Sequence, residues 1–336
     1  MIIAVDAAGG ENAPREIVEG AIKASQEYNV EVALVGNKGI LHLMAGRHLN
    51  KSKLSIVEAS QVIEPHESPV KAVKSKPDSS IVVGVNMVRD GRASAFVSAG
   101  NTGAVVFASL LSLGKIEGVE RPALGSFLDF TPTTPTLLID AGANADCRPS
   151  HLVQFAYLGT TYVKHILNIR YPSVRLLSNG EEETKGNRLI QESHGLLKKT
   201  RLNFVGNIEG QDISKKTADV IVTDGFTGNI VIKTIEGLGD AFLGVVRQTG
   251  HVLSAAYHLQ GRTLLQDIGL GPWVQRVDYR EYGGACLLGV NGAIIVSHGR
   301  SQAKAIKNAI GLAKRTAERD ICRIIREENY DQANRS

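Results

Sequence analysis

The sequence has few cysteines and few aromatic residues. Cys147, Cys286 and Cys322 are odd in number and far apart, and no Cys-x-x-Cys pair occurs. This pattern excludes a disulfide framework and a zinc ribbon and favours a reducing, cytoplasmic compartment. Aromatic residues make up 5% of the chain and the net charge is only +4. The basic stripe interleaved with aromatics that marks nucleic-acid-binding proteins is absent. We therefore expect no nucleic-acid partner.

Long apolar runs are also missing. No run reaches the roughly 20 residues that a membrane-spanning helix needs. The best candidate, Ile230–Val246, is interrupted by charges at Lys233, Glu236 and Asp240. The chain begins with the strand-like Ile2–Val5 rather than with a basic and then apolar leader. We therefore expect neither a spanning helix nor secretion.

The glycine fingerprint of nicotinamide-binding folds is absent as well. The first strand is followed by "DAAGGEN" and not by Gly-x-Gly-x-x-Gly. A dehydrogenase on a similar fold is therefore not supported.

Glycine itself is abundant, at 35 residues, and strand-like runs alternate with helical ones along most of the chain. This alternation predicts an α/β protein with three α/β/α layers around a largely parallel, doubly wound sheet. We expect one domain over residues 1–326, with two lobes as an open alternative. An amphipathic helical excursion is expected at about 236–275 and a polar, frayed tail at 327–336.

Two turns in this alternation read alike. "AGNTGA" follows a strand-like run at 95–97, and "DGFTGN" follows another at 220–222. The matching positions are Gly100 with Gly225, Thr102 with Thr227, and Gly103 with Gly228. A glycine turn that leads into a helix N-terminus offers unpaired N–H groups and a favourable dipole to an anion. Two such turns predict a phosphate or carboxylate site, although glycine at each could simply make the turn fit.

Polar residues follow many of the predicted strands. They are Asp6, Ser98, Asn101, Asp140, Asn144, Asp224 and His298. Ligands of parallel α/β sheets bind outside the carboxyl ends of the strands, so we expect these residues to converge on one edge and bind substrate. The aspartates could alternatively hold Mg²⁺. No compact ligand spacing supports this, and turn formation and helix capping explain the same residues. We therefore expect no cofactor and no resident metal.

Several motifs together resemble the bacterial phosphate acyltransferases. They include "VDAAGGENAP", "VSAGNTGA", "LLIDAGAN", "SNGEEETKGN", "TDGFTGN" and "SHGRS", in the family's order and over almost the whole chain. Glu11, Ala8 and Cys286 depart from the family pattern, which has Asp, Met and Pro there. The resemblance implies the fold of phosphotransacetylases and isopropylmalate dehydrogenases. It also implies transfer of a long-chain acyl group from acyl carrier protein to inorganic phosphate, for phosphatidic acid and phospholipid synthesis.

This reaction suits the residues. Phosphate is the nucleophile and a thiolate leaves readily, so neither a nucleophilic side chain nor a strong acid is required. What is needed is a site that positions phosphate and stabilises the oxyanion. We predict that Lys185 and Asn229 do this, although a solvated lysine and a helix cap are simpler explanations of each. Hydroxyls of Ser98, Thr102 and Thr227 are further candidates.

A stripe at helical spacing lies in the predicted excursion. Its members include Leu238, Phe242, Val245, Leu253 and Leu259. Core or dimer packing explains such a stripe. The resemblance implies a homodimer that attaches peripherally to the membrane and supplies a membrane glycerol-phosphate acyltransferase, and the stripe is the natural candidate for either contact.

Two other functions remain open. A phosphotransacetylase-like enzyme would keep the turns and use acyl-coenzyme A. A non-catalytic phosphate-binding adaptor would keep the turns and lack Lys185 and Asn229, which are both present.

Overall fold

The computed structural model describes residues 1–336 except 50–51, 131–133, 240, 242–282 and 334–336. The first half of the chain gives, in order, β1 (Ile2–Asp6), α1 (Arg15–Tyr28), β2 (Glu31–Gly36), α2 (Lys38–Leu49), β3 (Leu54–Glu58), α3 (Pro69–Ser75), α4 (Ser80–Arg89), β4 (Ala95–Ser98), α5 (Thr102–Ser112), β5 (Ala123–Leu128) and β6 (Thr136–Ile139).

The second half gives α6 (Pro149–Ile166), β7 (Ser173–Leu177), α7 (Arg188–Leu197), β8 (Asn203–Ile208), the 3₁₀ helix η1 (Gly210–Lys215), β9 (Val220–Val222), a helix at 225–239, β10 (Ala285–Leu288), β11 (Ala293–Val296), α11 (Ala303–Glu318) and α12 (Ile321–Ala333). Among the described helices, none is long and apolar enough to cross a bilayer.

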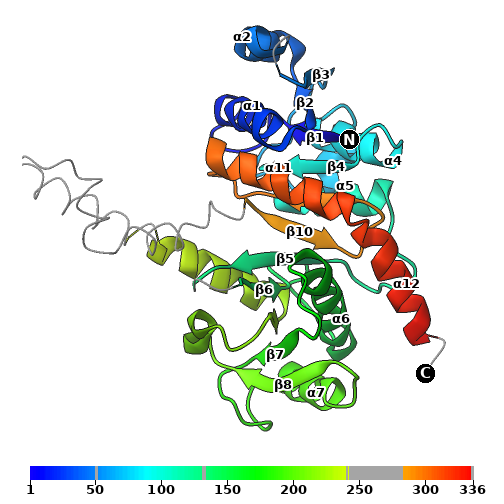
Figure 1. Ribbon diagram of the computed structural model, residues 1–336, viewed down its shortest axis with the longest axis vertical. Coiled ribbons are helices and arrows are strands. Elements are labelled where there is room, and N and C mark those ends of the chain that lie inside the picture. The colour runs from blue at the N-terminus through cyan, green and yellow to red at the C-terminus, as the bar shows by residue number, and fades with distance from the viewer. Residues whose placement is uncertain (50–51, 131–133, 240, 242–282, 334–336) are drawn as a thin grey trace, which may run out of the picture.

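The described strands form one sheet of 11 strands in the order β3-β2-β1-β4-β11-β10-β5-β6-β9-β7-β8. Neighbours pair in parallel except at three places, β11 with β10, β10 with β5, and β5 with β6. Figure 1 shows one half of the molecule around β1 and β4, and the other around β6, β7 and β8. The predicted largely parallel α/β sheet is confirmed, and the sheet runs through both halves.

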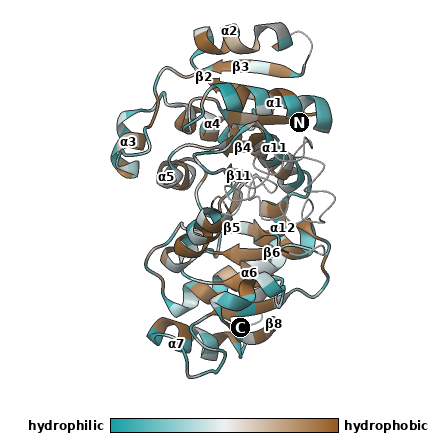
Figure 2. Cartoon of the chain, turned by 90° about the vertical axis from the view of Figure 1, so that its left-hand side faces the viewer, coloured by the Kyte–Doolittle hydropathy of each residue, from teal (hydrophilic) through white to brown (hydrophobic). Residues whose placement is uncertain are grey.

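Strand side chains alternate between two faces, as the pleat requires. On one face, Ile3, Val97 and Leu137 belong to a core that includes residues of α1, α6 and α11. On the other face, Ala4 and Phe96 pack with α4 and α5, while Leu138 and Ile221 pack with the helix at 225–239. The sheet therefore lies between two helical layers, and Figure 2 shows its apolar strands enclosed by them.

The polar residues were expected to converge at one end of the strands, and this expectation is wrong. Three antiparallel pairings separate the two halves of the sheet, and an odd number of reversals leaves the halves running in opposite directions. The carboxyl ends of β1, β4 and β11 therefore lie at one edge, and those of β6, β7 and β9 at the opposite edge. The strand β5 was not predicted, because its sequence "ALGSFL" contains Gly and Ser.

The C-terminal end also differs from the prediction. A polar, frayed tail was expected from residue 327 onward. Instead α11 ends at Glu318, Asp320 takes a left-handed conformation with φ of 49°, and α12 continues as a helix to Ala333. A left-handed residue breaks an α-helix, so the two helices can point in different directions.

Candidate active site

A cavity of about 280 Å³ lies on one face of the sheet, between the N-terminus of α5 and the helix at 225–239. Its floor is formed by side chains of β5, β10 and β11, including Leu124, Ser126 and Leu128, which alternate along β5 and so share a face. β10 has only four residues and β5 six. Strands of this length span about 13–20 Å, so groups from the two opposite edges can reach a common cavity.

Three of the predicted site residues meet in this cavity. Thr102 comes from the first glycine turn, Asn229 from the second, near the start of the helix at 225–239, and His298 from the loop after β11. Lys233 and Glu236 also line it and were not predicted as site residues. The sequence contained the information needed to find them. Lys233 and Glu236 follow Asn229 by four and seven residues, so all three lie on the same helical face.

Asp6 organises the loops beside the first turn and does not line the cavity. Its carboxylate is fully buried and accepts hydrogen bonds from the N–H groups of Ala8 (3.1 Å) and Gly9 (2.9 Å) and from Ser98 Oγ (2.7 Å). Ser98 Oγ in turn accepts from the Gly100 N–H at 3.0 Å. Burial raises the pKa of Asp6, and these hydrogen bonds oppose the shift. Ser98 and Gly100 therefore belong to this buried network.

Asn101 joins the first turn to the segment at 61–68. Its side-chain oxygen accepts from the Ala104 N–H at 3.1 Å and caps α5. Its amide donates to the carbonyls of Glu64 (3.3 Å), Pro65 (3.2 Å) and Glu67 (3.1 Å).

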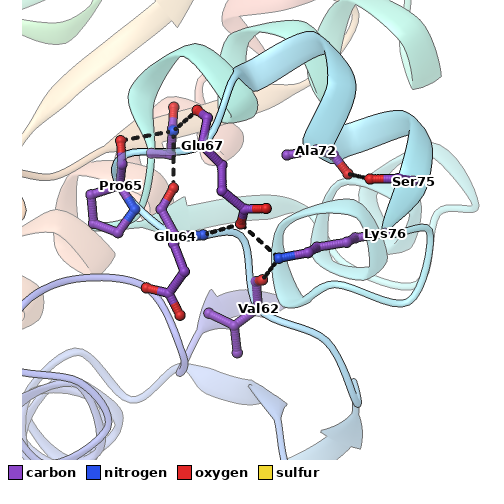
Figure 3. Close-up of polar contacts among 8 residues, drawn as sticks. Val62, Glu64, Pro65, Glu67, Ala72, Ser75 and Lys76 are labelled. Atoms are coloured by element: carbon purple, nitrogen blue, oxygen red, sulfur yellow. Dashed lines mark hydrogen bonds and ion pairs between the residues drawn. The ribbon is translucent and has the colours of Figure 1, made fainter.

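Lys76 fixes the same segment from its other side. Figure 3 shows its ammonium reaching the Val62 carbonyl (2.7 Å) and the Glu67 carboxylate (2.6 Å). Lys76 and Asn101 therefore hold this segment together from two sides. The polar atoms of the Asn101 side chain are used in these structural bonds rather than for a ligand.

Asp140 plays the corresponding role near the second turn. It accepts from the N–H groups of Leu124, Gly142, Ala143 and Asn144, and from the Asn144 side-chain amide, at 2.8–3.1 Å. Burial raises the pKa of Asp140, while these donors lower it. Asp140 and Asn144 therefore shape the 140–144 loop, whose Ala141 and Gly142 line the cavity.

In the second turn, Asp224 caps the helix at 225–239. Its two carboxylate oxygens accept from the Thr227 N–H (2.9 Å) and from Thr227 Oγ1 (2.7 Å). The Gly225 N–H donates to the Asn144 carbonyl at 2.8 Å. These N–H groups and this hydroxyl are therefore not available to an anion. In the first turn, by contrast, the Asn101 side chain caps the N–H of Ala104. The N–H groups of Thr102 and Gly103 come before it in α5 and are not used by this cap.

The turn glycines are required by close packing. A Cβ on Gly228 would lie 1.9 Å from the Asp140 carbonyl oxygen, and one on Gly225 would lie 2.6 Å from the Asn144 carbonyl oxygen. On Gly103 it would lie 2.6 Å from Cγ of Pro69. The shared Gly spacing thus brings each turn against a neighbouring segment.

Lys185 lies outside the cavity lining. It is exposed in the loop after β7, which is held by bonds from Gly186 N–H to Asn179 Oδ1 (2.8 Å) and from Asn207 Nδ2 to the Glu182 carbonyl (2.9 Å). Asn207 is buried and also contacts His194 Nδ1 at 2.9 Å. The role of Lys185 stays a prediction.

The remaining predictions concern the apolar stripe and a metal. Leu238 is 67% exposed on the helix at 225–239. Phe242, Val245, Leu253 and Leu259 lie outside the described residues. Within the described part of the chain, no group of three or more His, Cys, Asp or Glu side chains could hold a metal ion.

Comparison with known proteins adds a decisive observation. The family described as fatty acid synthesis protein matches residues 1–324. The chain belongs to this family. Phosphate acyltransferases from Dehalococcoides mccartyi and Pelotomaculum thermopropionicum are 58% and 47% identical to it. The alignments cover 98% and 97% of this chain and 94% of each relative.

Solved structures show the same fold for this family member. A phosphotransacetylase from Streptococcus pyogenes superimposes with a TM-score of 0.61 at 17% identity, covering 95% of this chain and 94% of the other. A branched-chain phosphotransacylase from Enterococcus faecalis gives 0.57 at 14% identity, covering 94% and 99%. These identities support the fold assignment and nothing finer.

Proposed function

We propose that this protein is an acyltransferase that moves an acyl group from a thioester donor to inorganic phosphate and releases an acyl phosphate. The relatives named phosphate acyltransferase, which match nearly the whole chain, support this reaction. The cavity carries the proposal structurally. Its lining combines apolar side chains, among them Leu124, Leu128, Ile232 and Ile235, with the polar side chains of Thr102, Asn229 and Lys233. A reaction that joins an apolar acyl group to an anion needs both surfaces in one site.

In this mechanism phosphate attacks the thioester carbonyl directly. Asn229 is exposed at the start of its helix and lines the cavity, so its amide can donate to the developing oxyanion. Thr102, with the N–H groups at the start of α5, favours an anion in the same cavity. Lys185 is proposed to add positive charge from the loop after β7.

We propose that the donor is a long-chain acyl thioester of acyl carrier protein. Basic side chains along α11 and α12, among them Lys307, Lys314 and Arg323, favour an acidic partner, although these three already pair with carboxylates of this chain. By the family resemblance, the acyl phosphate serves a membrane glycerol-phosphate acyltransferase, and the protein is a cytoplasmic homodimer attached peripherally to the membrane.

The proposal is tested by free thiol released from a long-chain acyl carrier protein, with and without phosphate. We expect release that depends on phosphate and is weak when acyl-coenzyme A replaces the carrier. Equal release from coenzyme A would favour the reaction of the phosphotransacetylases that share the fold. No release from either donor would favour a non-catalytic adaptor.

A further inference from the structure

The helix at 225–239 presents three polar side chains to the cavity. Asn229, Lys233 and Glu236 all line it, and their spacing of four and three residues places them on one face. Lys233 also lines a second hollow beside the cavity, together with Glu11 and Arg300. Lys233 is exposed and is shared by the linings of both hollows.

Glu236 stands three residues after Lys233, a spacing at which a carboxylate and an ammonium on one helix can pair. It bonds to a different partner here. Glu236 is buried, and its Oε2 lies 3.2 Å from His298 Nε2. In the described part of the structure, Lys233 forms no ion pair.

His298 is held in one orientation by its other ring nitrogen. The Arg300 N–H donates to His298 Nδ1 at 3.1 Å. Nδ1 is therefore an acceptor, so the neutral ring carries its proton on Nε2 and donates it to Glu236. The loop after β11 thus holds the Glu236 carboxylate in a bond that does not involve Lys233.

We propose that Lys233 binds the phosphate ion in the cavity, and that His298 keeps Glu236 from neutralising it. This inference rests on the proposed function and adds a phosphate-binding residue to it. Lys233 is the catalytic residue of the pair, because it touches the substrate. His298 is a positioning residue, because it acts through Glu236.

The chemistry is balanced without any further reactant. An oxygen of hydrogenphosphate forms a bond to the thioester carbonyl carbon, the carbon–sulfur bond breaks, and the proton of the hydrogenphosphate ends on the sulfur. Lys233 remains protonated throughout. Its charge holds the nucleophile next to Asn229, one helical turn away, and offsets the negative charge that gathers in the transition state.

The first test uses the full chain with Lys233→Met, and Lys23→Met as the matched control. Lys23 pairs with Glu19 at 2.6 Å and does not line the cavity. Binding of radiolabelled phosphate is measured by equilibrium dialysis, and the KM for phosphate by thiol release. We expect Lys233→Met to raise the Kd and the KM for phosphate at least about tenfold, as loss of a charge-assisted hydrogen bond does, and Lys23→Met to leave both unchanged. Unchanged phosphate binding in Lys233→Met would overturn the proposal.

The second test separates positioning from a merely structural role. His298→Ala frees Glu236 to pair with Lys233, so phosphate binding should weaken several-fold. Adding Glu236→Gln removes the competing charge and should restore it, with Glu236→Gln alone as the control. If His298→Ala keeps a native unfolding midpoint and the double variant shows no recovery, the role given to His298 is wrong.

The dialysis also separates this inference from the proposed function. Phosphate binding that is lost in Lys233→Met, in a protein that releases no thiol, would keep the site and reject the reaction. Phosphate-dependent release with binding that is insensitive to Lys233 would keep the reaction and reject the site.

Discussion

The two glycine turns share a sequence pattern and differ in what they do. The first, at 99–104, uses its polar side chain for architecture, because Asn101 caps α5 and clamps the carbonyls of Glu64, Pro65 and Glu67. The second, at 224–229, uses for architecture both the Asp224 side chain, which caps the helix at 225–239, and its closely packed backbone. It packs against the 140–144 loop and delivers Asn229 and Lys233 to the cavity. Similar local sequence thus gives different helix starts, because α5 begins at Thr102 whereas the second helix begins already at Gly225, the counterpart of Gly100. The neighbouring segments decide the role of each turn.

The largest expected effect tests the packing of the second turn. Gly228→Ala places a methyl 1.9 Å from a backbone oxygen, whereas Gly103→Ala meets a proline ring that can shift. We expect Gly228→Ala to lower the free energy of unfolding by about 3 kcal/mol or more, and Gly103→Ala by about 1 kcal/mol. Urea unfolding measures both, and equal losses would show that the two turns are packed alike.

The next prediction concerns Lys185, and it asks whether a loop in the second half of the molecule contributes to catalysis. Its loop follows β7, which pairs with the strand leading into the second turn. We expect Lys185→Ala to lower turnover at saturating substrates by about 10-fold or more, as loss of a charged transition-state contact does. Lys199→Ala, at an exposed position in the turn after α7, serves as a control. Near-normal turnover would remove Lys185 from the mechanism.

Exchanging the two capping side chains sharpens the comparison. Asp224→Asn keeps the capping oxygen, and we expect it to cost less than about 1 kcal/mol. Asn101→Asp also keeps the cap but removes the amide and places a charge against three carbonyls. It should cost about 2 kcal/mol or more. Thermal or urea unfolding compares the two variants, and a larger loss for Asp224→Asn would reverse the roles assigned to the turns.

The smallest effect concerns pH. Burial raises the pKa of Asp6 in the folded protein, so the folded state holds its proton to a higher pH than the unfolded state does. The contribution of Asp6 to stability is therefore full below its unfolded pKa of about 4 and falls as pH rises through the folded pKa. Asp6→Asn should destabilise the protein more at about pH 3 than at about pH 7. Urea unfolding of both proteins at the two values measures this, and a loss that grows with pH would contradict it.

The sequence predicts the layers and most strands, because apolar alternation and βα order depend on neighbouring residues. It predicts Asn229 and Thr102 as cavity residues through the turn motif. The reversal of direction between the halves depends on which strands pair through β5 and β10, and that is a long-range property. Lys233 and Glu236 were noted only as charges that interrupt an apolar run, since their common face with Asn229 matters only once the cavity is known.

The amide of Asn229 gives the most direct test of the site. The turnover of Asn229→Ala, measured as phosphate-dependent thiol release at saturating substrates, should fall by about 10²–10³. Its unfolding midpoint should remain that of the wild type, because Asn229 is exposed at the helix start. Near-normal turnover in the folded variant would contradict the claim that the second turn delivers the catalytic group to this cavity.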